Sequence, residues 1–354
     1  MDANNAIAEA AARILADVCD PQTVNRAKSD DWKKPAWKAL EDAGLPLAWV
    51  PEHLGGSGAG IADGFEVLRV AGRYATPLPL AETLLAGWLL ARADIPVPNG
   101  ALSCGPTRDR DRLEIGAGGV LNGTLRSVPF ARETEHLAVL ARRPAGGYAI
   151  ALVKTDGLRL KFTTGVGGDP SDSVSFDKVR AMALKDVPGD FSEHTFLLMG
   201  AVARSMQMAG ALESILATAV DYANERVAFE RPIAKFQAVQ HNLARLAGEA
   251  AVALSTAASA ASAIAAEDLS SDGVFLEAAS AKIRVGEAAG EGAGIAHQVL
   301  GAIGFTREHT LHRFTRRLWA WRDDFGNESF WAVMLGNAVA GKGGEGLWPL
   351  LAAR

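Results

Sequence analysis

The chain has 354 residues, a formal net charge of -5 and 49% hydrophobic residues. This length predicts two or three domains with a large buried interior, and the acidic balance gives no reason to expect nucleic acid. No run of consecutive apolar residues approaches the roughly 18 that a membrane span needs, and the N-terminus lacks the basic cluster of a secretory signal. Cys19 and Cys104 fit neither a disulfide framework nor a metal site, so a reducing cytoplasm is the expected compartment.

Residues 1–98 are predicted to form an N-terminal helical domain. Apolar residues recur at every third or fourth position, as on the buried face of a helix, in 7–18, 61–71 and 80–93. A further helix should stop at Gly44. Prolines and glycines on both sides of a short apolar run then predict a packed loop over 45–58.

Residues 99–188 are predicted to form a middle β-domain. A segment rich in proline and glycine, 95–100, separates it from the helices. Two apolar runs that flank Arg142–Gly146 predict a hairpin, and alternating apolar residues predict another strand over 171–179. We expect the strands to form a small, β-barrel-like domain.

Residues 189–354 are predicted to form a C-terminal helix bundle. Apolar residues step by three or four along 198–223 and again along 236–264, which is the pattern of long bundle helices. Pro232 must end the first helix, because proline breaks the hydrogen-bond ladder, and the second should begin near Lys235. The predicted fold is therefore mainly α with a small β-domain, ending in a four-helix bundle.

The junction between these two helices displays Arg226, Phe229 and Gln237. A guanidinium fork suits a phosphate, an aromatic face suits a ring, and an amide suits polar edges. The junction is thus a candidate site for a flat, anionic ligand. The alternative is an arginine that caps a helix end beside an aromatic residue of the core.

A second string, residues 298–306, contains Gln298 and glycines at 301 and 304. Glycines let the backbone approach a ligand closely. They are equally suited to a close helix crossing, and the sequence leaves both readings open.

These two strings, in this order, together with the loop over 45–58, resemble the acyl-CoA dehydrogenase family. The resemblance covers the whole chain and is weakest in the middle domain. It implies a flavin enzyme that oxidises acyl-CoA thioesters to 2,3-enoyl products in lipid metabolism and passes electrons to a separate carrier protein. It also implies that the first string contacts FAD, commonly that of a neighbouring subunit, and that Gln298 and Gly301 contact its adenosine end. We therefore expect an oligomer, a dimer or tetramer, built from one or two kinds of chain.

The chain departs from the family at three cofactor positions. Glu230 replaces a glycine of the first string, and Ala302 replaces one of the second. The hydroxyl-rich motif of the β-domain is reduced to residues 101–107, where Ser103 and Thr107 carry the hydroxyls. Of these two, Ser103 is the candidate cofactor contact.

The expected catalytic base is Asp324. The family places a glutamate directly before a glycine here, and this chain has Phe325 before Gly326. Asp324 is one residue away, and a carboxylate in an apolar pocket could abstract the α-proton of a thioester. The alternative is a solvated aspartate beside Arg322. A second position that some members use for the base corresponds to the neighbourhood of Gly200, which has no carboxylate.

Three functions remain from the sequence. The first is an FAD-dependent acyl-CoA dehydrogenase with Asp324 as base. The second is a non-catalytic partner subunit of a heteromeric acyl-CoA dehydrogenase, favoured by Phe325 and the reduced β-domain motif. The third is a flavin oxidase or monooxygenase on the same fold. No metal is expected, because the histidines at 297, 309 and 312 lack ligand partners at metal spacing.

Overall fold

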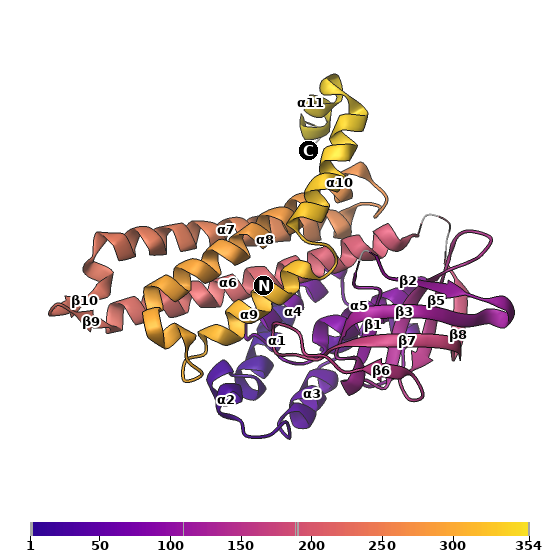
Figure 1. The fold of residues 1–354 in the computed structure, drawn as a ribbon, viewed down its shortest axis with the longest axis horizontal. Helices are drawn as coiled ribbons and strands as arrows, with labels where there is room; N and C mark the ends of the chain where they lie inside the picture. The colour runs from indigo at the N-terminus through magenta and orange to yellow at the C-terminus, as the bar shows by residue number, and fades with distance from the viewer. Residues whose placement is uncertain (1–2, 109, 188, 190, 353–354) are drawn as a thin grey trace.

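The computed structural model describes residues 3–108, 110–187, 189 and 191–352. Helices come first, strands follow, and helices return to the end of the chain (Figure 1). The expected fold class is confirmed: the protein is mainly α-helical, with a β region between two helical parts.

The N-terminal part consists of α1 (Ala3–Val18), α2 (Pro21–Arg26), α3 (Lys33–Asp42), α4 (Ile61–Arg73) and α5 (Leu80–Arg92), with 3-10 turns η1 (Leu45–Leu47) and η2 (Glu52–Leu54). Gly44 follows α3 with a φ of 69°, the left-handed conformation in which glycine commonly ends a helix. In the loop after it, the Trp49 indole donates to the carbonyl oxygen of Ile61 at 2.9 Å and packs edge-on against Phe65. The loop is packed as the sequence predicted.

The strands are β1 (Leu102–Gly105), β2 (Arg112–Ile115), β3 (Val120–Pro129), β4 (His136–Arg142), β5 (Tyr148–Lys154), β6 (Arg159–Lys161), β7 (Ser171–Arg180) and β8 (Ala183–Asp186). They form one sheet in the order β6-β7-β3-β2-β4-β5-β8, with β1 parallel to β4. The predicted hairpin is present as the antiparallel pair β4–β5. Along β4, Leu137 and Val139 enter the core of the β-domain, whereas Ala138 and Leu140 enter the core shared with the helices. Both faces of this strand are buried, which explains its continuous apolar sequence.

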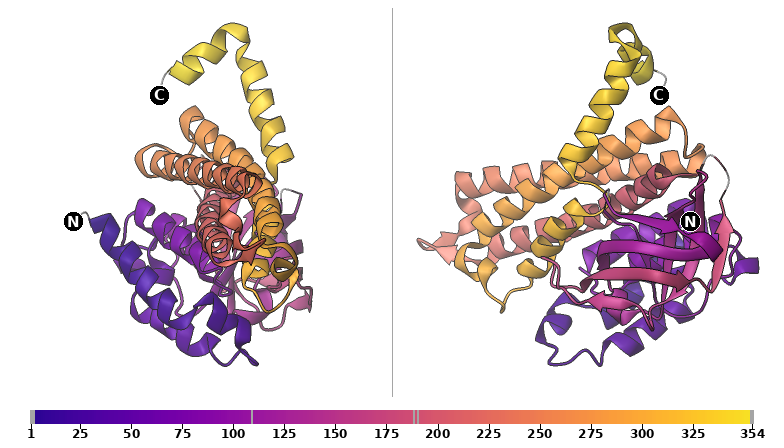
Figure 2. Two further views of the ribbon diagram at one scale, coloured as in Figure 1. Left: turned by 90° about the vertical axis from the view of Figure 1, so that its left-hand side faces the viewer. Right: turned by 45° about the vertical axis from the view of Figure 1, so that its right-hand side comes forward.

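The C-terminal part consists of α6 (Glu193–Glu225), β9 (Val227–Ala228), β10 (Arg231–Pro232), η5 (Ile233–Lys235), α7 (Gln237–Ala266), α8 (Asp272–Leu300), η6 (Gly301–Phe305), α9 (Leu311–Asp323), α10 (Glu328–Lys342) and α11 (Gly344–Ala352). Helices α6 to α9 contact one another as a bundle. Helices α10 and α11 project away from it (Figures 1 and 2). The long first helix ends before Pro232 and the next begins just after Lys235, as the proline predicted.

Within the described residues, α7 alone is long and apolar enough, by length and composition, to cross a membrane. Polar residues interrupt the apolar runs of this helix, so the sequence shows no continuous apolar run of that length, although the average over a long window is apolar. In the fold it packs against α6 and α8 as a bundle helix.

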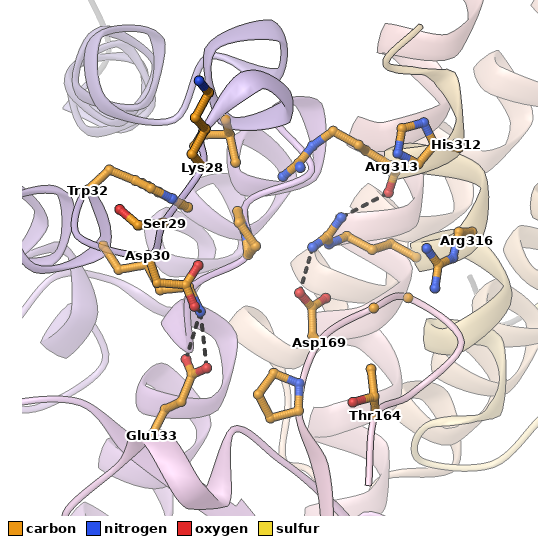
Figure 3. A pocket seen from close by; sticks show the side chains of 18 residues that line it. Lys28, Ser29, Asp30, Trp32, Glu133, Thr164, Asp169, His312, Arg313 and Arg316 are labelled. Atoms are coloured by element: carbon orange, nitrogen blue, oxygen red, sulfur yellow. Dashed lines mark hydrogen bonds and ion pairs between the residues drawn. The ribbon is translucent and has the colours of Figure 1, made fainter. Parts of the chain in front are cut away.

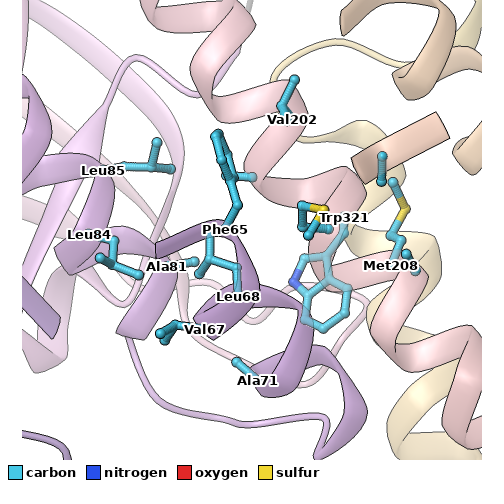
Figure 4. Close-up of a cluster of buried hydrophobic side chains, with 14 of the residues drawn as sticks. Phe65, Val67, Leu68, Ala71, Ala81, Leu84, Leu85, Val202, Met208 and Trp321 are labelled. Carbon is cyan, nitrogen blue, oxygen red and sulfur yellow. The ribbon is translucent and has the colours of Figure 1, made fainter. Parts of the chain in front are cut away.

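One core joins the N-terminal helices to the bundle (Figure 4). Helix α4 crosses α6 at glycines of both helices. A Cβ on Gly72 would lie 2.0 Å from the Gln207 carbonyl oxygen, and one on Gly210 would lie 1.9 Å from that of Arg69. The two backbones therefore touch, and this contact fixes the middle of α6, which carries the central side chain of the candidate site.

Candidate functional site

The first candidate string forms a turn at one end of the bundle, which we call the bundle-end turn (residues 226–237). Strands β9 and β10 pair antiparallel, and the two residues between them, Phe229 and Glu230, have φ values of 51° and 65°. Two-residue hairpin loops of this kind require positive φ at both positions, which glycine adopts most easily. Glu230 therefore occupies a position whose backbone favours the glycine that the resemblance implies.

The ligand-type side chains of the bundle-end turn point outward. The Phe229 ring is 90% exposed. Arg226 and Gln237 are exposed as well, and within the described chain neither side chain has a hydrogen-bond or ion-pair partner. Arg226 does cap the end of α6, as the alternative expected, but the core aromatic of that alternative is wrong, because Phe229 is outside the core.

The second string lies at the same end of the bundle (Figure 1). Tyr222, near the end of α6, and His309, beyond η6, have ring centroids 6.5 Å apart. Gln298 is exposed on the last turn of α8. Gly301 ends that helix with φ 63° and ψ -141°, a conformation open almost only to glycine, and an added Cβ would meet nothing within 4 Å.

These groups fit the phosphate and ring portions of a dinucleotide. A free guanidinium, two exposed amides, an open glycine backbone and an exposed ring lie together, and no described carboxylate pairs with Arg226. All of them lie on the outside of a single chain. They can contact a ligand without enclosing it.

Asp324 lies at the junction of the three parts of the molecule, directly after α9. It is 8% exposed, and its carboxylate accepts a hydrogen bond from Arg204 Nε at 3.1 Å. Arg108 approaches the other oxygen at 3.7 Å. The alternative of a solvated aspartate is wrong, because Asp324 is buried and paired with two arginines.

Arg204 also holds a second carboxylate. Its guanidinium donates to Glu82 at 2.6 Å and to the side-chain oxygen of Gln207 at 2.6 Å. Burial would lower the pKa of Arg204, but the carboxylates of Glu82 and Asp324 outweigh burial, so the pKa is raised and Arg204 stays charged. Asp324 is thus one member of a compact, charge-balanced cluster, which we call the Arg204 cluster (Glu82, Arg108, Arg204 and Asp324).

A buried lysine, Lys282, binds the end of α9, shortly before Asp324 of the Arg204 cluster. The Lys282 ammonium donates to the carbonyl oxygens of Trp321 at 3.0 Å and of Arg322 at 2.7 Å, which belong to the last turn of α9. A cation at this end of a helix satisfies carbonyls that have no partner within the helix. Burial lowers the pKa of Lys282 to about 7.

The two positions where the resemblance implies a base contact each other. Phe325 is 1% exposed and packs edge-on against Phe196, with ring centroids 5.8 Å apart. A Cβ on Gly200 would lie 2.2 Å from the Phe325 ring. The phenylalanine fills the space that the glycine leaves empty, so neither position provides a proton acceptor.

The cavity beside Asp324 is small, about 90 Å³, and the side chains of the Arg204 cluster line it. Ligand pockets for drug-sized molecules are ~300–1,000 Å³. A flavin ring therefore does not fit beside Asp324 in this arrangement. Ser103 is fully buried, and its hydroxyl donates to the Pro129 carbonyl oxygen, so it presents no free hydroxyl to a cofactor.

Sequence reasoning missed Glu82, Arg204 and Lys282. Glu82 and Arg204 are single charged residues inside otherwise apolar helical stretches, whereas Lys282 has Arg284 close by in the sequence. A charge in an apolar stretch must find a partner when it is buried, and this signal could have pointed to Glu82 and Arg204 but not to Lys282. No group of three or more metal-binding side chains occurs in the part of the chain that the structure describes.

Comparison with known proteins agrees with this fold. The family model described as the acyl-CoA dehydrogenase N-terminal domain matches residues 1–93, and that of the C-terminal domain matches residues 192–322. The chain belongs to the acyl-CoA dehydrogenase family.

Several relatives are similar over most of this family member. Acyl-CoA dehydrogenase IpdE2 of Mycobacterium tuberculosis is 27% identical over 87% of this chain and 88% of its own length. Acyl-CoA dehydrogenase FadE34 of the same organism is 32% identical over 82% of this chain but only 40% of its own length. Among solved structures, the ChsE4-ChsE5 complex from Mycobacterium tuberculosis contains a chain with a TM-score of 0.85 at 23% identity, over 96% of this chain and 98% of that one.

Proposed function

We propose that this chain is a subunit of a heteromeric acyl-CoA dehydrogenase. It would contribute the bundle-end turn to a flavin site that it shares with a sister chain of the same family. The main observation behind the proposal is that Asp324 is hydrogen-bonded to Arg204 within the Arg204 cluster, beside a cavity of only about 90 Å³.

The bundle-end turn supports the proposal. Arg226, Phe229 and Gln237 are exposed and uncommitted, and Gln298 and Gly301 lie at the same end of the bundle. Arg226 would hold a phosphate and Phe229 would cover a ring. The sister chain would supply the rest of the site and the carboxylate that takes the α-proton.

The reaction proposed for the assembly is α,β-desaturation of an acyl-CoA thioester. FAD, when bound, would supply the hydride acceptor. Electrons would then pass to a separate carrier protein. This chain's own part would be to bind and orient the cofactor from the outside.

The assemblies of its neighbours also support the proposal. Two solved structures with similar chains are named for two proteins each, the ChsE4-ChsE5 complex and the Tcur3481-Tcur3483 steroid acyl-CoA dehydrogenase, the latter with a TM-score of 0.82 at 24% identity. FadE34 is long enough to contain a second segment of this size, because the match spans only 40% of it. These likenesses motivate a two-chain assembly for this protein.

A second candidate is a self-sufficient dehydrogenase in which Asp324 is the base. It is favoured by the position of Asp324, whose carboxylate lines the cavity where the three parts of the chain meet. This function requires Arg204 and Arg108 to release Asp324 and the cavity to widen.

The two functions can be separated by two variants of the assembled protein. The chain would be co-expressed with a candidate sister chain of the same family that retains the glutamate base, and acyl-CoA-dependent reduction of an electron acceptor would be followed. The proposal predicts that R226A lowers flavin content and turnover, whereas a folded D324N retains turnover. Loss of turnover in D324N, with flavin still bound, would instead establish Asp324 as the base.

A further inference from the structure

A second cavity, of about 630 Å³, opens beside loop 164–170 (Figure 3). Its walls are the segment between α2 and α3, this loop of the β-domain, and the first turns of α9. The volume lies within the ~300–1,000 Å³ range of small-molecule sites. Gly167, Asp169 and Pro170 line both cavities, so the loop separates them.

The carboxylates of this cavity are already paired. A carboxylate oxygen of Asp169 lies 2.5 Å from a guanidinium nitrogen of Arg317. The Lys33 ammonium lies 3.0 Å from a carboxylate oxygen of Asp30 and 3.0 Å from one of Glu133. Five basic side chains line the cavity, and its three carboxylates pair with two of them.

The remaining basic side chains have no counter-ion. Lys28, Arg313 and Arg316 also line the cavity, and none of them has an ion-pair partner in the described chain. Five basic side chains against three carboxylates leave two positive charges, with His312 counted as neutral.

Arg313 is the least satisfied of these groups. Its Nε is buried and has no hydrogen-bond partner, and the same holds for Nε of the neighbouring Arg317. Burial, reinforced by Arg317, lowers the pKa of Arg313 to about 10. Figure 3 shows the Arg313 side chain extending from α9 toward the segment that carries Trp32. A desolvated guanidinium without an ion-pair partner lacks the counter-charge that would offset the cost of its burial.

We infer that this cavity binds the phosphoryl dianion of a small molecule, held chiefly by Arg313 and Arg316. A guanidinium presents a planar fork that matches phosphate oxygens, and the two uncompensated charges match a dianion. The half-buried Trp32 offers a surface for a planar portion of the ligand. Either inorganic phosphate or a nucleotide would supply this chemistry.

The inference is independent of the proposed function. None of its residues belongs to the bundle-end turn or to the Arg204 cluster. A failure of either proposal leaves the other in place.

The test is calorimetric titration of the full chain at constant ionic strength, with inorganic phosphate and with AMP as probes. We expect saturable binding at one site per chain. R313Q should weaken it at least tenfold, and R313K, which keeps the charge without the fork, should weaken it less. R159Q changes an exposed arginine outside the cavity and should bind as the wild type does.

Tighter binding of AMP than of phosphate would identify a nucleotide as the better ligand, and equal binding would identify free phosphate. Thermal unfolding checks that each variant is folded, and R316Q, at an exposed position, replaces R313Q should the latter fail this check. The inference is overturned by the absence of saturable binding of either probe, or by an R313Q or R316Q variant that binds both as tightly as the wild type.

Discussion

Two arginines of helix α6 and its C-cap have opposite environments. In the first half of the helix, Arg204 is buried between Glu82 and Asp324, and its guanidinium donates to both carboxylates. At the C-cap, the Arg226 side chain is exposed and has no hydrogen-bond or ion-pair partner among the described residues. The first arginine stabilises the fold, whereas the second is free to bind another molecule. Substitutions at buried positions around Arg204 should therefore change the free energy of unfolding more than a substitution of Arg226 does.

The largest loss of stability is expected for R204M. The substitution leaves the carboxylates of Glu82 and Asp324 buried without their shared cation, which costs about 3–5 kcal/mol of unfolding free energy. Denaturant unfolding measures the loss. R226M, at an exposed position, is the matched control. A loss of unfolding free energy below about 1 kcal/mol in R204M would refute the structural role of the Arg204 cluster.

The next effect concerns the pH dependence due to Lys282. Its pKa is about 7 in the folded chain and about 10.4 in an unfolded one. Between these values the unfolded state binds more protons, so the unfolding free energy should rise with pH. The gain from pH 7 to 10, relative to K282M in the same buffers, should be on the order of a few kcal/mol. If the free energies of unfolding of the two proteins changed in parallel with pH, the lowered pKa of Lys282 would be contradicted.

A smaller loss is expected when Gly200 is replaced by alanine. The new Cβ would lie 2.2 Å from the Phe325 ring, which has to move. Overpacking of this kind costs about 1–3 kcal/mol. G294A is the matched control in α8, where an added Cβ meets nothing within 4 Å and helix propensity favours alanine. Equal stability of the two variants would show that Phe325 is not confined by Gly200.

The smallest effect on stability is expected for R226A, within about 0.5 kcal/mol, because the side chain is exposed and unpaired. The same variant should lower flavin retention in the assembled protein, because a phosphate contact is lost. Absorbance of released flavin per protein measures this. Retention equal to the wild type would count against the bundle-end turn as a cofactor contact.

Local sequence signals predicted the bundle-end turn well. Pro232 marked the end of one helix, the restart near Lys235 followed, and the order of the two strings indicated that they act together. The structure adds that Glu230 lies in a left-handed loop position, which favours glycine and which the string alone did not reveal. These features depend on neighbours within a few residues, which is why a pattern could show them.

The Arg204 cluster could not be predicted in the same way. Arg204 is 122 positions from Glu82 and 120 positions from Asp324 in the chain. Asp324 was singled out as the candidate base, and that role stays a prediction; its ion-pair partners depend on how α5, α6 and α9 pack. Sequence spacing does not specify such long-range ion pairs. Ser103 remains a prediction as a cofactor contact, although its hydroxyl is used inside the β-domain.

The partner-subunit function is tested most directly by the visible absorption spectrum of the purified chain after equilibration with FAD and removal of the excess. We expect an essentially colourless protein when the chain is alone, and a flavin spectrum when it is assembled with its sister chain. Close to one flavin per chain in the protein alone, bleached anaerobically by an acyl-CoA, would refute the partner-subunit function and establish a self-sufficient dehydrogenase.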